Sequence, residues 1–577
     1  MSAIGVRKHV IMANFIGRFG GYGKVGFMSK DLYNMCSREK RKLLVDGDAT
    51  TAIAMLEMRK KKYPDFFFEH EVDSKGNLRN LFWCDGQSRQ DYQDYGDVVV
   101  FDSTYKMNRY GMPFVPFVGV NNHRKTVVFG CAILSDETER TYVWLLNTFK
   151  KAMFQKNPRS IITDSDSAMI RAVRKVFPDE WYRICSWHIE KNMAKHLSFK
   201  SLPEFRSLLY YMTSTETFEQ RWHAFGLKWK NNKNKTWLKR MYKKRRLWAA
   251  AYLKEGYWLG MKSNQRSESL NSCLHLHLDY GMTLVHLILH YENAIVRLRE
   301  TEARDDCTTS QSLPVAVTES WIIEKSAAKV FTPANFYILQ EELNKIGGLE
   351  IMNIYVDADG ARQFAVVWKK KRQHRFYVDY RPASSDHTIE CSCKRMIRRG
   401  LPCKHILHVL HYLDLEEIPS CLVLRRFSKN ARSGLPARRT SDLYGWSFSD
   451  PEDQRKFTEL NVLSAEALQV AWSDPVLYEQ LKASFNDIIS KRQAYATAPD
   501  VSRRFVNTDA TIVGDPEEVP RKGARKNKRK RDGDDGPVSR NGRPLAYHER
   551  PKKRIRCGSC QQLGHTSHSI KCPYHPK

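Results

Sequence analysis

The chain has 577 residues, which is too long for one ordinary domain and predicts three or more folded units. It contains 95 lysines and arginines against 64 aspartates and glutamates, so its formal net charge is +31. This excess favours polyanionic partners, because neutralising phosphates releases counterions; a basic surface that only keeps the protein soluble is the alternative. No run of about 18 apolar residues is present, so the sequence predicts no membrane-spanning helix.

The region from 97 to 187 alternates short β-branched or aromatic runs with amphipathic patterns. Such runs are typical of buried strands, and the amphipathic stretches are typical of helices. Three strands, a helix, a strand, a helix and a strand follow one another, which is the order of an RNase H-like α/β fold. The expected strands cover 97–105, 114–120, 126–134, 159–164 and 181–187, and the expected helices cover 138–153 and 167–177.

Composition outside this region predicts further units. The stretch before the core is basic and mostly helical, and strand signals vanish after it until a hairpin with strands FAVVW and RFYVDY. The expected organisation is a helical lead-in (1–90), an RNase H-like core (91–200), an all-α insertion (201–262), a returning core helix (263–300), a linker and hairpin (301–375), a zinc finger (376–415), a helical C-terminal region (416–510), a disordered basic linker (511–556) and a zinc-knuckle-like module (557–577).

Two aspartates follow predicted strands of the core. Asp102 ends the first strand and Asp164 ends the fourth, and in this strand order the two ends are parallel neighbours. Carboxylates at adjacent strand ends can hold two Mg²⁺ ions about 3.5–4 Å apart for phosphoryl transfer. Glu268, which opens a later helix, is the best candidate for a third carboxylate. Spacing alone leaves open that each aspartate only terminates a strand or caps a helix.

A first group of metal-ligand residues lies between 391 and 405. Cys391, Cys393, Cys403 and His405 are spaced C-x-C-x9-C-x-H, with the first pair on a hairpin and the second pair at the start of a helix. Three thiolates and one imidazole form a complete tetrahedral set for structural Zn²⁺. His408, one turn later, is a possible competing ligand, although packing of this side chain on the helix is the simpler interpretation.

A second group closes the chain. Cys557, Cys560, His565 and Cys572 are spaced C-x2-C-x4-H-x6-C, which is similar to a zinc knuckle with a longer final gap. Zinc knuckles occur among modules that bind single-stranded nucleic acid. The nearby histidines at 568 and 575 are spare ligands, so the exact set stays open, and a cysteine-containing disordered tail is the alternative.

Basic clusters occur in three places. The runs 521–531 and 551–556 are dense in lysine and arginine and are typical of nuclear import signals or phosphate-binding tails, or else of a solvated linker. Residues 228–246 contain ten lysines and arginines, no acid, and the aromatics Trp229, Trp237 and Tyr242. Such a mixture can follow a phosphate backbone with stacked bases, but the aromatics can equally be core residues of the insertion.

Long motifs of this chain resemble one family. The segment that begins FDSTYKMNRYGMPF, with SIITDSDSAM and CSWHIEKN after it and WAAAYLKEGYWLGMKSNQRSESLNS farther on, is similar to the core of the Mutator-like (MULE) transposases. More specifically, it resembles the plant far-red-impaired-response family of domesticated transposases, over about residues 20 to 430. The resemblance implies an ancestral DDE site at Asp102, Asp164 and Glu268, a transposase-type pair at Cys185 and His188, and a SWIM zinc finger around Cys391.

The resemblance also implies a function. Members of the family are nuclear transcription regulators connected with far-red light signalling, so association with DNA and with related family members as homo- or heterodimers is expected. Transposase activity is expected to be lost. Members usually carry an N-terminal zinc-binding domain that recognises DNA sequence. We find no ligand set for such a domain before the transposase-like part, so we expect DNA binding with weak sequence selectivity. There are two alternatives: an active DDE transposase that uses Mg²⁺, and a truncated protein that modulates full-length family members.

Overall fold

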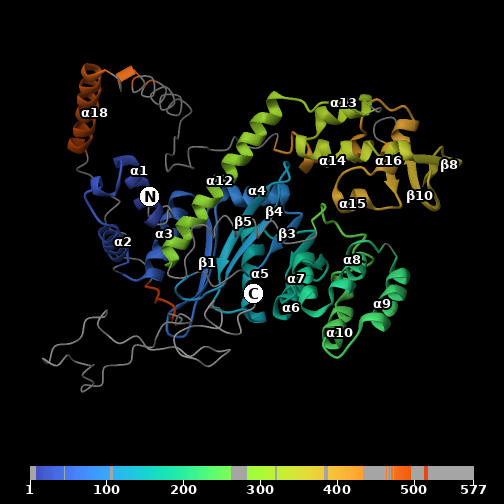
Figure 1. Ribbon diagram of the computed structural model, residues 1–577, viewed down its shortest axis with the longest axis horizontal. Coiled ribbons are helices and arrows are strands. Elements are labelled where there is room, and N and C mark those ends of the chain that lie inside the picture. Colours follow the sequence, from blue (N-terminus) through green and yellow to red (C-terminus); the bar gives the residue numbers. More distant parts are fainter. Residues whose placement is uncertain are drawn as a thin grey trace, which may run out of the picture. The chain divides into compact units, whose positions relative to one another are not determined.

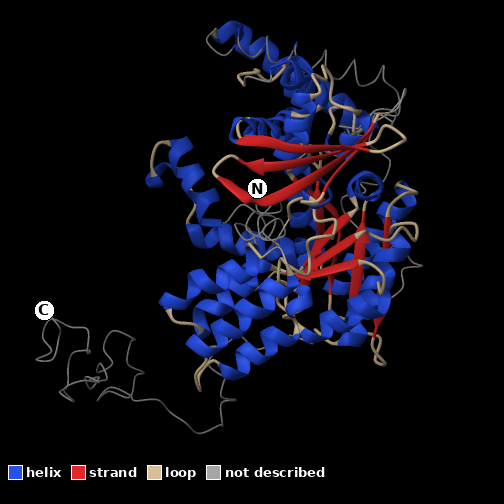
Figure 2. Ribbon diagram, turned by 90° about the vertical axis from the view of Figure 1, so that its right-hand side faces the viewer, coloured by secondary structure: helices blue, strands red, loops and turns tan. Residues whose placement is uncertain are grey.

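The computed structural model describes residues 8–432 except 45, 104–107, 213, 262–281, 319–320 and 383–386, and farther on 463, 467, 470–471, 474–495 and 512–517. The chain separates into two compact units, 1–519 and 520–577, and the described residues all belong to the first. Figures 1 and 2 show this unit as a mixed α/β structure with two separate sheets. None of the described helices combines the length and the apolar character needed to cross a membrane.

The larger sheet has seven strands in the order β1-β2-β5-β4-β3-β6-β7. Neighbouring strands are antiparallel from β1 to β3, whereas β3, β6 and β7 run parallel. All five strands and both helices expected in the core are present, within a few residues of their predicted limits. The strands are β1 (Phe67–Val72), β2 (Leu78–Cys84), β3 (Val98–Phe101), β4 (Phe114–Val120), β5 (Thr126–Ile133), β6 (Ser160–Thr163) and β7 (Trp181–Ile184).

Successive side chains of the central strands enter different cores, because side chains alternate across a sheet. Val98 and Val100 of β3 pack with α3 and α12 on one face. Val99 and Phe101 pack with α4, α5 and α6 on the other. The sheet is therefore covered on both sides, which explains why its strands are continuous apolar runs. These helices are α3 (Asp48–Lys62), α4 (Gly86–Tyr95), α5 (Glu139–Ala152), α6 (Ser167–Val176) and α12 (Leu284–Gln311).

Asp48, the first residue of α3, holds the start of α12 in place. The side chain is fully buried and accepts hydrogen bonds from the backbone amides of Leu284 (2.8 Å) and Val285 (3.2 Å) and from the Tyr110 hydroxyl (3.0 Å). The hydroxyl of Thr283 caps the same helix from the preceding position. Helix α12 is thus fixed at its N-terminus by a residue more than 230 positions earlier in the chain.

A helical insertion follows β7, as the loss of strand signals predicted. Helix α7 (Ser186–His196) leads into α8 (Leu202–Tyr210), α9 (Thr215–Trp229) and α10 (Lys235–Lys243). Aromatic side chains form its core: Phe205 stacks on Trp248 with ring centroids 5.5 Å apart, and Phe218 meets Trp248 edge-on at 5.7 Å. This core is continuous with the α5 and α6 face of the larger sheet.

The smaller sheet has four antiparallel strands in the order β11-β10-β9-β8. The predicted hairpin is confirmed as β9 and β10, and helix α16 packs over the sheet. The elements of this region are α13 (Trp321–Val330), α14 (Pro333–Leu343), β8 (Leu349–Val356), β9 (Arg362–Trp368), β10 (Lys371–Arg381), β11 (Thr388–Cys391), α15 (Arg395–Arg399) and α16 (Lys404–Tyr412).

The structure corrects the sequence-based organisation at four places. The lead-in begins with the helices α1 (Lys8–Phe19), α2 (Ser29–Leu43) and α3, but it ends in the β1–β2 hairpin, which extends the larger sheet. The polar break expected at 301–314 is mostly helix: α12 continues to Gln311, and Glu302 and Thr309 of this stretch are buried. The linker expected at 301–375 contains α13, α14 and β8.

The fourth correction concerns the C-terminal segments. Residues 420–427 of the region expected to be helical form two 3-10 turns, at Ser420–Leu422 and Arg425–Phe427, before the later helix α18 (Pro475–Tyr495). Within the linker expected to be disordered, residues 512–517 lie against α3 and the β1–β2 turn. Local composition did not show this contact, because its partners are more than 400 residues away.

We expect Asp48→Ala to lower the free energy of unfolding by about 2–4 kcal/mol, because it leaves two buried amides and one buried hydroxyl without their acceptor. Urea denaturation measures this loss. Asp46→Ala removes an exposed carboxylate two positions away and is the matched control, for which we expect no more than about 0.5 kcal/mol. Equal stability of the two variants would contradict the role of Asp48.

Candidate functional site

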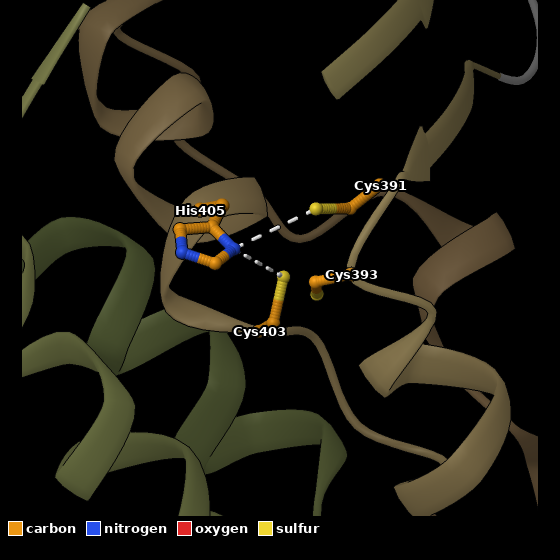
Figure 3. A group of neighbouring side chains, drawn as sticks. All are labelled: Cys391, Cys393, Cys403 and His405. Carbon is orange, nitrogen blue, oxygen red and sulfur yellow. Dashed lines mark hydrogen bonds between the residues drawn. The ribbon is translucent and has the colours of Figure 1, made fainter. Parts of the chain in front are cut away.

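The candidate metal centre lies where β11 meets the start of α16. Cys391 is the last residue of β11, Cys393 follows in the turn, and Cys403 is the N-cap of α16 with His405 in its first turn. Ser392 fixes the turn to β10: its amide donates to the Tyr377 carbonyl and its hydroxyl accepts from the Tyr377 amide, both at 2.8 Å. Strand and helix therefore present their ligands from opposite sides (Figure 3).

The ligand atoms of these four residues all lie within 4.8 Å of one another. The Nδ1 atom of His405 is 3.6 Å from the Cys391 sulfur and 3.8 Å from the Cys403 sulfur, as the dashed lines of Figure 3 mark. Cys391, Cys403 and His405 are at most 5% exposed. The ring of Phe376 stacks on His405 with centroids 4.2 Å apart, so the imidazole is held in one orientation.

The thiols strongly influence one another's ionisation. Hydrogen bonds from Cys391 and Cys403 lower the pKa of Cys393 far below its usual value, while the same contacts and burial raise the pKa of Cys391. One thiolate is thus stabilised by two thiols in a buried pocket. A divalent cation would replace those protons, since thiolates are the form that binds metal. The donor set and its spacing fit Zn²⁺, which prefers four sulfur and nitrogen ligands.

His408 is not part of this group of ligand atoms, so the structure favours packing over coordination for this side chain. It lies one turn after His405 on α16, and burial lowers its pKa to about 4. Its neutral imidazole is compatible with the apolar surroundings of the helix.

Two polar residues connect the metal centre to the rest of the fold. Buried Glu342 of α14 accepts hydrogen bonds from the Arg395 side chain at 2.9 Å and the Lys404 amide at 3.3 Å, so it contacts both short helices around the site. Arg124, in the β4–β5 turn, donates to Asn335 of α14 at 2.6 Å and to the Arg399 carbonyl at 3.3 Å. The metal centre is therefore fixed to the larger sheet through direct hydrogen bonds.

The first and fourth predicted strands are parallel neighbours, as expected. Val98 pairs with Ser160 and Val100 with Ile162, so the same register brings Asp102 and Asp164 to equivalent positions just beyond the two strands. Asp102 is 4% exposed. Among the described residues these aspartates belong to no cluster of three potential metal ligands, and Glu268 lies outside the described residues. Their role as metal ligands therefore stays a prediction.

Asp164 lies in a turn that it helps to form. Its Oδ1 accepts the Asp166 amide at 2.9 Å, and Asp166 in turn caps α6 by accepting the Met169 amide at 2.9 Å. Burial raises the pKa of Asp164 to about 6, and Lys244 opposes this shift by its positive charge. The Lys244 ammonium donates to the Ser165 carbonyl at 3.0 Å. The insertion thus brings a lysine directly to the carboxylate edge of the sheet.

Cys185 and His188 have different environments in the β7–α7 turn. Cys185 is fully buried and its amide donates to the Thr163 carbonyl at 2.7 Å. His188 places Nε2 3.7 Å from Oδ2 of Asp102. Burial lowers the pKa of His188 to about 4, so the ring is neutral near pH 7 and the contact is not a full ion pair. This contact between the Cys-x2-His pair and the carboxylate edge was not predicted from the sequence.

The basic stretch 228–246 lies within the insertion and covers the end of α9, the turn after it, α10 and the start of the next 3-10 turn. Trp237 is buried, Trp229 donates to Glu204 at 2.8 Å, and Tyr242 donates to Glu219 at 2.8 Å. These aromatics therefore pack and bond within the insertion, which favours the core interpretation over base stacking. Eight of the ten basic residues are exposed, namely Lys228, Lys230, Lys233, Lys235, Lys239, Arg240, Lys243 and Arg246; we call them the basic face.

The remaining candidate residues cannot be placed. The second group of ligands (Cys557, Cys560, His565 and Cys572) and the basic runs 521–531 and 551–556 lie outside the described residues. Zinc binding at the C-terminal cluster and phosphate binding by the two basic runs stay predictions from sequence.

Comparison with known proteins is consistent with both regions of the site. Residues 98–192 match the MULE transposase domain, and residues 378–414 match the SWIM zinc finger. The chain is 33% identical over 444 residues to protein FAR1-RELATED SEQUENCE 5 of Arabidopsis thaliana, covering 75% of this chain and 55% of that protein. It is 32% identical over 385 residues to FAR1-RELATED SEQUENCE 9 of the same plant, covering 65% and 69%.

A MULE-type α/β core joined to a Cys₃His centre of SWIM type defines the class of transposase-derived zinc proteins. Within that class, the chain belongs to the family of FAR-RED IMPAIRED RESPONSE 1 and the FAR1-related sequences. Identity to FAR-RED IMPAIRED RESPONSE 1 of Arabidopsis thaliana itself is 27% over 454 residues. The chain spans about half the length of most of the curated relatives it matches.

We expect Cys403→Ser and His405→Ala to reduce the zinc content of the purified full chain by one ion per molecule, because three ligands do not complete the tetrahedral set. His408→Ala and exposed Cys421→Ser are the controls and should keep the wild-type content. Elemental analysis by mass spectrometry measures the ratio. Unchanged zinc in Cys403→Ser would show that this cluster is not a zinc site.

Proposed function

We propose that the protein is a nuclear transcription regulator that uses a transposase-derived core as a scaffold for binding nucleic acid. The observation that carries this proposal is that the segment with the exposed cations of the basic face also brings Lys244 to the carboxylate edge of the sheet. Lys244 contacts the Ser165 carbonyl at that edge, and the eight exposed cations of the basic face precede and follow it in the same insertion. Family membership supports the regulatory role.

The scaffold is, in this proposal, an RNase H-like core. Support comes from the strand order β5-β4-β3-β6-β7, with three antiparallel strands followed by two parallel ones. Asp102 and Asp164 then correspond to the first two carboxylates of an ancestral DDE site. Proteins with such a site bind Mg²⁺ between the carboxylates, where the ions stabilise the attacking and the leaving oxygen.

Catalytic activity is absent in our proposal. Burial keeps the pKa of Asp164 at about 6, and Lys244 already supplies a positive charge to this edge. The charge of Lys244 opposes the binding of a divalent cation at the two aspartates. The alternative, an active transposase, rests on the retention of the aspartates at equivalent strand ends. Magnesium-dependent DNA cleavage or joining that is abolished by Asp102→Ala would favour this alternative.

Nuclear import and partner choice complete the proposal. The basic runs 521–531 and 551–556 are suited to import, and imaging a tagged chain that lacks 521–556 tests this role: unchanged nuclear accumulation would exclude it. Dimers with a second copy or with related family members are proposed from family membership alone, and sedimentation of the purified chain tests self-association.

We expect nucleic-acid binding to be mainly electrostatic and to fall steeply as salt rises, because it releases counterions. Lys239→Glu with Lys243→Glu on the basic face should weaken binding several-fold and reduce the log-log salt slope by roughly 2. Lys61→Glu with Lys62→Glu, an exposed pair at the end of α3, makes the same charge change elsewhere and is the control. Fluorescence anisotropy with a labelled duplex measures the affinity and the salt slope of each double variant. Equal weakening by the two double variants would contradict a specific basic face.

We expect Asp164→Asn to stabilise the fold at pH 8 by about 1–2 kcal/mol and to change little at pH 4. The folded state raises the pKa of this carboxyl from 3.8 to about 6. The contribution of this carboxyl to stability is therefore fully present below the unfolded-state pKa of 3.8. It is lost as the pH rises through the folded-state pKa of about 6. Thermal unfolding across this range, with and without millimolar Mg²⁺, measures the effect. Strong stabilisation of wild type alone by Mg²⁺ would contradict the inactive site.

A further inference from the structure

A short segment far along the chain lies against the core at the start of α3. Residues 512–517 make five hydrogen bonds with it, and Gly514 forms a parallel bridge with Asn77 in the β1–β2 turn. In Figure 1 the segment is the short orange-red stretch below α3. Two of the bonds join Thr50 and Val513: Thr50 Oγ1 donates to the Val513 carbonyl (2.7 Å) and accepts from the Val513 amide (3.3 Å). The others run from the Ala49 amide to Asp515 Oδ1 (2.7 Å), from the Leu78 amide to the Gly514 carbonyl (2.8 Å) and from the Gly514 amide to the Gly76 carbonyl (2.9 Å).

Three consecutive residues of the segment are recognised in different ways. Val513 is 2% exposed and belongs to the same apolar core as α3. Gly514 approaches Asn77 closely: a Cβ at this position would lie 2.4 Å from Asn77 Oδ1 and would displace that side chain. Asp515 binds through its carboxylate. The site therefore favours the sequence Val-Gly-Asp, because the valine is buried, the glycine allows a close backbone approach and the aspartate makes a charge-assisted hydrogen bond.

Asp515 supplies the capping side chain that α3 lacks at its N-terminus. The N-cap of α3 is Gly47, which has a φ of 94° and no side chain to cap the helix. The first amides of a helix have no partner within the helix and are normally satisfied by a capping side chain. Asp515 caps the Ala49 amide from 466 positions away, and its negative charge suits the positive end of the helix dipole.

We propose that the groove between the start of α3 and the β1–β2 turn is a docking site for the chain's own Val-Gly-Asp segment, and that docking anchors the basic run 521–531 to the core. Arg521 follows Glu517 by four positions in the sequence, and four residues of fully extended chain span at most about 14 Å. An anchored polycation is held at a high effective concentration near any ligand of the core.

This consequence for nucleic-acid binding rests on the proposed function, but docking itself does not. Docking is therefore tested with a synthetic peptide of residues 508–520 that carries a fluorophore, added to the full chain. Full-length Val513→Asp should bind the peptide, because its own segment no longer fills the groove. Wild type should bind at least about tenfold more weakly, since its tethered segment competes at high effective concentration.

The peptide and the chain each have a matched control. A peptide with Asp515→Ala should bind the Val513→Asp chain about fivefold more weakly, as expected for the loss of a helix cap. A peptide with Glu517→Ala, which removes an exposed carboxylate two residues later, should bind like the original. No binding to either chain, or equal binding of the Asp515→Ala and Glu517→Ala peptides, would overturn the docking site.

Hydrogen exchange of the full chain gives a second measurement that needs no added peptide. The amides of Ala49 and Leu78 should exchange severalfold faster in Asp515→Ala than in wild type or Glu517→Ala. Equal exchange in all three chains would overturn the proposal. Protection that grows with protein concentration would show that the segment docks onto a second copy, and would overturn the anchor within one chain. A failure of nucleic-acid binding with docking intact would instead contradict only the proposed function.

Discussion

The rest of the structure depends on one constraint, the burial of the larger sheet on both faces. Val98 and Val100 of β3 enter one core and Val99 and Phe101 the other, so no polar side chain fits within the strand. In this strand the first polar side chain, Asp102, comes directly after the last strand residue. The parallel pairing of β3 with β6 brings two such ends to the same edge, which is where ligands of open α/β sheets generally bind.

The two cores also explain how distant segments become one unit. The face covered by α3 and α12 continues into the smaller sheet and the metal centre, while the opposite face continues into the insertion. Arg124 and Glu342 add direct hydrogen bonds between these regions. A metal ion at Cys391 and its partners would therefore stabilise more than its own loop, because the helices around it are bonded to α14 and to the β4–β5 turn.

Sequence patterns predicted what is local and missed what is distant. The core strands were found because both-sided burial makes continuous apolar runs, and the Cys₃His set was found because its spacing is short. Strand β1 was missed because it lies at the edge of the sheet and its Glu69, His70 and Glu71 reach solvent in part. The contacts of Lys244 with the Ser165 carbonyl and of His188 with Asp102 join segments whose approach no local pattern encodes.

The position of Lys244 determines the charge that a nucleic acid would meet at the carboxylate edge under the proposed function. A pair of carboxylates alone would repel a phosphate backbone, and two metal ions normally remove that repulsion. Here Lys244 contacts the turn of Asp164 and places a positive charge beside that carboxylate. Under the proposed function, this positive charge would weaken the repulsion of a phosphate backbone at the edge without a metal ion.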